Sequence, residues 1–186
     1  SEREVEWKRL LGVFVDLCQA VAFAHSRGVV HRDLKPDNVM LGSYGETMLL
    51  DWGLAKVLAS PEETASGGSS SHVRLSHASG STDTQAGSKL GTPAYMAPEV
   101  AEGHAEAADQ RTDVYLLGAT LYEILTGQPP RRGSSFDEMV ELARTIDPVP
   151  PRKIDSRIAR PLEAISLKAL SHLPEDRYQT AQELAG

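Results

Sequence analysis

Residues 113–126 are apolar on nearly every side, and this run constrains the fold of the 186-residue chain more than any other feature. A helix on the surface of a domain keeps a polar face, so a helix without one belongs in the interior. Thr112 is the predicted N-cap, and Gly127 suits the left-handed residue that follows a helix end. The sequence therefore predicts a central buried helix in a chain of one-domain size.

More helices are expected on both sides of this run. Residues 5–26 carry two adjoining apolar stripes, which pass through Val21 and Ala22, and Gly28 follows as a stop signal. Two stripes predict a largely buried helix. Shorter helices are predicted at residues 136–146, at residues 161–171 and from Thr180, where Glu183 would complete a capping box.

Two short apolar segments on either side of the polar turn GSYGE predict a β-hairpin. If Leu41 faces Met48, the antiparallel register places Asn38 opposite Asp51 at the open end of the hairpin. Two oxygen-bearing side chains would then meet at one place. The predicted fold class is mainly α, with this one small hairpin.

The composition is that of a soluble domain, with 40% hydrophobic and 24% charged residues. No apolar run is expected to reach the roughly 18 residues of a membrane span. The formal net charge of −7 disfavours nucleic acid as a partner. Cys18 is the single cysteine, so no internal disulfide can form, which suits the cytoplasm. Ser1 opens directly into a charged helical stretch, so no signal peptide is expected, and the missing initiator Met hints at a fragment.

Residues 59–90 differ in character from the rest of the chain. Of these 32 residues, 16 are Ser, Thr or Gly, and apolar side chains nearly vanish. Such a stretch cannot bury enough surface to offset the entropy of ordering it. The sequence predicts a mobile loop here.

Three motifs carry the chemistry of the chain. They are HRDLKPDN at residues 31–38, DWG at residues 51–53 and GTPAYMAPE at residues 91–99. Their residue types and spacing resemble those of the eukaryotic-like (Hanks-type) serine/threonine protein kinases of bacteria, although Trp replaces the usual Phe of D-F-G. A solvated polar turn would also hold such residues, but it would not require this spacing. The resemblance implies the large, C-terminal lobe of a kinase, in which the hairpin carries the metal ligands.

The resemblance implies a role for each side chain of the site. Asp33 would orient the substrate hydroxyl and accept its proton, and Lys35 would neutralise the transferring γ-phosphate. Asn38 and Asp51 would hold Mg2+, which prefers hard oxygen ligands. Thr92 would face Asp33 and Lys35 and shape the platform beside the phosphate acceptor.

ATP and Mg2+ are the implied cofactors. The nucleotide with its metal would contact Lys35, Asn38, Met40 and Asp51.

Other positions would support or regulate the site. They are His31, Arg32, Trp52, Gly53, Thr82, Thr84, Ser88, Glu99, Asp113 and Arg177. Asp113 would accept hydrogen bonds from the backbone of the catalytic loop, which is the HRDLKPDN segment at residues 31–38, and Glu99 would form a buried ion pair with Arg177. A phosphate on one of the loop hydroxyls would pair with Arg32 and order the loop. The remaining histidines show no ligand spacing and are expected on the surface or in loops: His25, His72, His77, His104 and His172.

No G-x-G-x-x-G loop and no V-A-I-K strand precedes the catalytic loop in this sequence. The resemblance therefore implies that residues 1–186 are a fragment whose small lobe is absent and which alone would be inactive. The parent enzyme would transfer the γ-phosphoryl group of Mg-ATP to Ser or Thr of protein substrates. Its other partners would be the missing small lobe and a second copy during autophosphorylation, and segments outside this sequence could anchor it in a membrane.

Two other functions stay open. A pseudokinase-like module would use the helical lobe to bind a partner without catalysis, but it would not require Asp33, Lys35, Asn38 and Asp51 together. A phosphotransferase for small molecules would keep similar acidic and amide residues. GTPAYMAPE and the region of Arg177 favour a protein substrate instead.

Overall fold

The computed structural model describes residues 2–58 and 92–186, with side chains from Val5 onward. The elements in chain order are α1 (Glu2–Ser26), β1 (Val29–Val30), η1 (Pro36–Asn38), β2 (Val39–Leu41), β3 (Thr47–Leu49), η2 (Trp52–Leu54), β4 (Lys56–Val57), α2 (Pro98–Ala101), η5 (Ala105–Ala107), α3 (Gln110–Thr126), α4 (Phe136–Thr145), α5 (Pro151–Ile154), α6 (Arg160–Ala169), η6 (Pro174–Asp176) and α7 (Ala181–Ala185). The described part of the chain is mainly helical, as predicted.

Helix α3 is the buried centre of the fold, and its side chains are buried over most of its length. Gly127 ends the helix with φ of 75°, as predicted from the sequence. The predicted N-cap was wrong. Asp109 caps the helix through a hydrogen bond from the Arg111 N–H at 2.7 Å, because α3 begins with a polar first turn that the apolar pattern does not reveal. Thr112 lies inside the helix.

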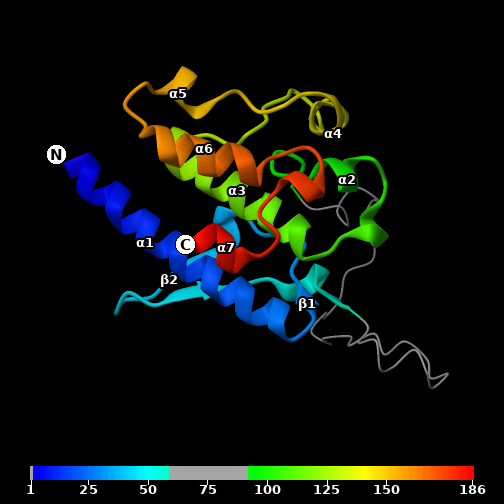
Figure 1. The fold of residues 1–186 in the computed structure, drawn as a ribbon, viewed down its shortest axis with the longest axis horizontal. Coiled ribbons are helices and arrows are strands. Elements are labelled where there is room, and N and C mark those ends of the chain that lie inside the picture. The colour runs from blue at the N-terminus through cyan, green and yellow to red at the C-terminus, as the bar shows by residue number, and fades with distance from the viewer. Residues whose placement is uncertain (1, 59–91) are drawn as a thin grey trace.

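Helices α1, α6 and α7 pack around α3 and form the main core with it (Figure 1). The crossing of α3 and α6 is close: a Cβ atom at Gly118 would lie 2.6 Å from the Cβ of Ala169. Two small residues at this crossing therefore allow the backbones to approach. Helix α7, at the C-terminal end of the chain, lies against α1.

Helix α1 is less buried than predicted. Phe14, Leu17, Cys18 and Val21 lie in the core, but Phe23 on the same helix is 64% exposed. Leu11, Val15 and Ala22 of the second apolar stripe are only half-buried, so that stripe is partly open. Residues Val5–Ser26 are also long and apolar enough to cross a membrane, by length and composition only, which the sequence reading did not expect. The core helices of soluble proteins pass the same measure.

The predicted β-hairpin exists, but its predicted register was wrong by one residue. Leu41 pairs with Thr47, and the Leu50 N–H donates to the carbonyl of Asn38 at 2.8 Å. Asp51 therefore lies one residue beyond the pair. The turn is tighter than expected because Gly45 adopts φ of 91°, which closes a short loop between the strands.

A second ladder joins β1 to β4, with Val29 opposite Val57 and Val30 opposite Lys56. This ladder was not predicted from the sequence, because two-residue strands carry no periodic signal. This ladder follows α1 directly and brings the chain after DWG back beside the start of the catalytic loop. The ends of the shorter helices agree with prediction to within about two residues, which is the usual uncertainty of helix ends.

Candidate active site

Asp113 holds the segment that carries HRD. Its side chain is fully buried in the first turn of α3, and its two carboxylate oxygens accept hydrogen bonds from the N–H groups of His31 and Arg32, each at 2.8 Å. Arg32 has φ of 70°, a left-handed conformation that costs energy for a residue with a Cβ. The two hydrogen bonds to Asp113 stabilise this bend, which immediately precedes Asp33.

His25 also contacts Asp113. The sequence predicted His25 on the surface or in a loop, and that prediction is wrong. Its Nε2 lies 2.8 Å from Asp113 Oδ2, and its side chain is almost fully buried. The spacing Cys18, Ala22, His25 continues one apolar stripe of α1 at four- and three-residue steps, which is the signal that would have found it. Of the other four histidines, His72 and His77 lie outside the described residues, while His104 is exposed and His172 is half-buried.

Asp33, Lys35, Asn38 and Thr92 lie together. Lys35 Nζ donates to Asp33 Oδ2 at 3.2 Å and to Thr92 Oγ1 at 2.8 Å. The Asn38 amide nitrogen donates to the Asp33 carbonyl at 2.7 Å and to its Oδ2 at 3.2 Å. Within the described residues no donor reaches the other carboxylate oxygen, Oδ1. Lys35 thus joins the catalytic loop to the segment that contains Thr92, 57 residues later.

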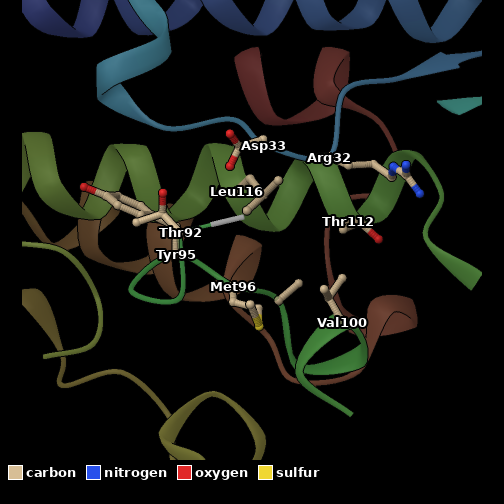
Figure 2. Close-up of a pocket in the computed structure, with 9 residues that line it drawn as sticks. Arg32, Asp33, Thr92, Tyr95, Met96, Val100, Thr112 and Leu116 are labelled. Carbon is tan, nitrogen blue, oxygen red and sulfur yellow. The ribbon is translucent and has the colours of Figure 1, made fainter. Parts of the chain in front are cut away.

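Figure 2 shows the pocket beside this cluster, with Asp33 above α3 and Thr92 and Tyr95 across from it. Met96 and Leu116 contribute its apolar wall. The Tyr95 hydroxyl donates to the carboxylate of Glu123. Burial, and secondarily this carboxylate, raises the pKa of Tyr95, so the phenol stays protonated at neutral pH. Asp33 and Arg32 are the charged residues that line the pocket, and its remaining lining is apolar or uncharged.

The candidate metal ligands offer suitable oxygen atoms. Asp51 is exposed at the end of the hairpin, and its Oδ1 accepts a hydrogen bond from the Gly53 N–H at 3.3 Å. No donor among the described residues reaches Asp51 Oδ2 or the side-chain oxygen of Asn38. One carboxylate and one amide oxygen fit Mg2+, which keeps several waters and phosphate oxygens in its shell. The described residues hold no group of three or more His, Cys, Asp or Glu suited to a metal, so the chemistry of these two side chains carries the assignment.

Trp52 occupies the position of the usual Phe and packs on the catalytic loop. Its ring lies 4.6 Å from that of His31, with 59° between the planes. The indole Nε1 donates to the Leu49 carbonyl at 3.2 Å, a hydrogen bond that Phe cannot form. His31 Nε2 lies 3.1 Å from the Leu50 carbonyl. These contacts join the DWG segment to both the hairpin and the catalytic loop.

Glu99 and Arg177 form a bidentate ion pair, with nitrogen to oxygen distances of 2.9 and 2.8 Å. The Arg177 side chain is fully buried and also donates to the carbonyls of Ser171, His172 and Arg111. The hydroxyl of Thr112 donates to Glu99 Oε1 at 2.8 Å. Burial alone raises the pKa of Glu99, but the hydrogen bonds and charge of Arg177 lower it below its ordinary range.

The remaining candidates are not part of this cluster. Met40 lies on β2 and is 50% exposed. Arg32 turns away from Asp33 in Figure 2, and its Nε donates to the Leu54 carbonyl at 2.6 Å. Thr82, Thr84 and Ser88 lie outside the described residues, as does the whole of 59–91.

Comparison with known proteins agrees with this geometry. Residues 3–185 match the family model described as protein kinase domain. The serine/threonine-protein kinase PknB of Mycobacterium tuberculosis is 38% identical over 177 residues, which are 95% of this chain and 25% of that protein. The serine/threonine-protein kinase PknD of Protochlamydia amoebophila is 41% identical over 183 residues, or 94% of this chain and 18% of that protein. The chain thus spans about a quarter or less of the length of these relatives, and it belongs to the protein kinase domain family, where it resembles bacterial serine/threonine kinases.

Proposed function

We propose that this chain is the large lobe of a serine/threonine protein kinase and that its parent protein transfers the γ-phosphoryl group of Mg-ATP to Ser or Thr hydroxyls of protein substrates. The observation that carries the proposal is the pair of hydrogen bonds from Lys35 Nζ to Asp33 and Thr92. They place a cation between a carboxylate and a hydroxyl at the end of a pocket. Phosphoryl transfer needs this combination of positioning and charge.

Asp33 is the residue that receives the substrate hydroxyl. Its Oδ2 is occupied by Lys35 and Asn38, which leaves Oδ1 to accept the proton of the attacking hydroxyl. Fixing Oδ2 also fixes the direction of Oδ1. A carboxylate held in this way orients the acceptor before the reaction and so lowers the entropic part of the barrier.

Asn38 and Asp51 are the proposed ligands of the metal. When bound, Mg2+ would neutralise charge on the phosphates of ATP, the donor of the phosphoryl group. Lys35 adds a second positive charge beside Asp33, where it would meet the transferring phosphate. The segment from Thr92 to Glu99 would support the substrate chain, since it forms the opposite side of the pocket.

The grip on the nucleotide is incomplete in this chain. The sequence contains neither a G-x-G-x-x-G loop nor a V-A-I-K strand before His31, so we propose that a small lobe from outside these residues supplies both. It would cover the exposed apolar side chains of the hairpin, which are Met40, Leu41, Met48 and Leu50. An open apolar surface of this kind marks an interaction site. We expect the 186 residues alone to bind Mg-ATP feebly and to transfer no phosphate.

The substitution Asp33→Asn in the intact protein tests the proposal. It removes the charge and the proton acceptor while keeping the size, so kcat should fall by about 100-fold or more with an unchanged melting temperature. Asp137→Asn, an exposed carboxylate at the start of α4, is the control and should transfer phosphate at the wild-type rate. Phosphate incorporation by Asp33→Asn within about threefold of wild type would contradict the role of Asp33 as proton acceptor. A wild-type protein that transfers no phosphate would favour the pseudokinase alternative.

A further inference from the structure

Arg131 is a buried cation that the site described above does not use. It lies between α3 and α4 and is only 5% exposed. Its Nε donates to the Leu142 carbonyl at 3.1 Å, and one Nη donates to the Tyr115 hydroxyl and, at 3.4 Å, to the Met96 carbonyl. The other Nη donates to the carbonyls of Ala143 and Ile146, both at 3.5 Å. The five N–H groups of the guanidinium therefore face five acceptors.

None of these acceptors is charged. Within residues 2–58 and 92–186, no carboxylate forms an ion pair with Arg131, whereas Arg177 is paired with Glu99. A buried charge without a counterion is unfavourable unless its hydrogen bonds are complete. The planar fork of Arg meets that requirement, and the single ammonium of Lys, with three donors at one point, does not. The geometry thus requires Arg at this position more than it requires a positive charge.

The acceptors belong to three different elements. Leu142, Ala143 and Ile146 lie at the C-terminal end of α4, where the last backbone carbonyls favour a cation. The Leu142 carbonyl also accepts the Ile146 N–H at 3.1 Å. Tyr115 belongs to α3, and its ring also contacts Arg177, whose Cζ lies 4.8 Å from the ring centroid.

Met96 belongs to the segment that faces Asp33 across the pocket in Figure 2. Arg131 thus connects the substrate side of the pocket to the body of the domain.

The two sides of the pocket have separate anchors. Asp113 holds the catalytic loop through the N–H groups of His31 and Arg32. The facing segment is held at Glu99 by Arg177 and at the Met96 carbonyl by Arg131. Loss of Arg131 would free the middle of the substrate side without touching the loop that carries Asp33.

We propose that Arg131 is a positioning residue for the protein substrate: it holds the Met96 side of the pocket in place and so acts on substrate binding rather than on the nucleotide or the chemical step. The proposal rests on the proposed kinase function. It predicts a division in the kinetics, with a change in KM for the protein substrate and none in KM for ATP.

The experiment compares Arg131→Met and Arg131→Lys with Arg132→Met in the intact protein. Arg132 is the matched control, because it is the exposed neighbouring arginine, and its side chain donates to Gln128 Oε1 at 2.9 Å. Arg131→Met keeps the length and apolar bulk of the side chain, and Arg131→Lys keeps the charge without the fork. The substrate is myelin basic protein, with ATP varied separately.

For Arg131→Met we expect KM for the protein substrate to rise about tenfold, with kcat and KM for ATP within about threefold of wild type. Arg131→Lys should give a similar rise, because its charge does not replace the fork, and Arg132→Met should match wild type. If Arg131→Met does not fold, Arg131→Lys tests the proposal by the same comparison of KM for the protein substrate with KM for ATP. Equal changes in both KM values, or an Arg131→Met protein that behaves like Arg132→Met, would overturn the proposal.

Amide hydrogen exchange gives a readout that does not depend on activity. The N–H groups of Tyr95 and Met96 donate to Thr92 and Pro93 at 3.1 and 3.3 Å in a turn next to the Arg131 contact. Their exchange should become about fivefold faster in Arg131→Met, while residues 31–38 keep the wild-type rate. Faster exchange in a protein without kinase activity would support the anchoring of the Met96 segment by Arg131 but contradict the proposed kinase function. Unchanged exchange at residues 92–100 would reject the anchoring itself.

Discussion

His25 Nε2 lies 2.8 Å from Asp113 Oδ2, although 88 residues separate them in the sequence. Both side chains are buried, and the same Asp113 oxygen accepts the N–H of His31. One carboxylate therefore joins the end of α1, the start of α3 and the catalytic loop. The position of Asp33 depends on helix packing through this single group.

Asp113→Asn should destabilise the chain by about 2 to 4 kcal/mol, because an amide offers one oxygen where two N–H groups need acceptors. Its NH2 group would face the N–H of either His31 or Arg32. Urea unfolding at pH 7 measures the loss. Asp16→Asn on the exposed side of α1 is the control and should change the free energy of unfolding by less than about 0.5 kcal/mol. Equal stability of the two variants would contradict the anchoring role.

The ion pair of Glu99 and Arg177 should make stability depend on acid. The pKa of Glu99 is lowered in the folded chain relative to its ordinary value of 4.5, so the unfolded chain takes up the proton first as the pH falls. The stabilisation is therefore complete above pH 4.5 and is lost as the pH drops through the lower folded pKa.

Glu99→Gln isolates this effect. At pH 7 the variant should be less stable by about 3 to 5 kcal/mol, because the buried guanidinium of Arg177 loses its counterion. The difference from wild type should shrink as the pH falls below 4.5, since Glu99 itself becomes neutral. Denaturant unfolding between pH 7 and pH 3 measures it, with Glu141→Gln on the surface of α4 as the control. A constant difference across this range would count against the ion pair as the source.

Thr92→Val should lower kcat/KM for the protein substrate by about tenfold or more, if the kinase function holds. Val keeps the shape of Thr but removes the hydroxyl that accepts from Lys35 Nζ at 2.8 Å. Without the Thr92 hydroxyl, Lys35 Nζ would no longer be held in place beside Asp33 Oδ2. Thr92→Ser retains the hydroxyl and should keep most of the activity. A Thr92→Val protein as active as Thr92→Ser would exclude a role for this hydrogen bond.

The local signals of the sequence were sufficient for the longer helices, for the hairpin and for the residue types of the catalytic loop. The apolar run of α3, the stop at Gly127 and the turn before β3 are short-range features, and each depends on neighbouring residues alone. The spacing of HRDLKPDN likewise placed Asp33, Lys35 and Asn38 in one short segment. Thr180 was predicted as an N-cap, and its hydroxyl accepts the Glu183 N–H at 3.1 Å.

The strand register and the N-cap of α3, which differ between alternatives by only a few residues, were predicted less well. Competing local geometries differ little in energy. The hairpin register depended on the left-handed Gly45, and the start of α3 depended on a polar turn capped by Asp109. An error of one residue in register moves every side chain to the other face of a sheet. The predicted pairing of Asn38 with Asp51 failed for this reason.

The sequence by itself determined the set of candidate site residues and the helix at the centre of the fold, since both follow from local spacing and apolar pattern. Only the tertiary structure decided what holds them: the contact of His25 with Asp113 and the set of acceptors around Arg131. These contacts join segments far apart in the chain. Hydrogen bonds of this kind depend on ångström-scale placement of packed helices, which no pattern of residue types encodes.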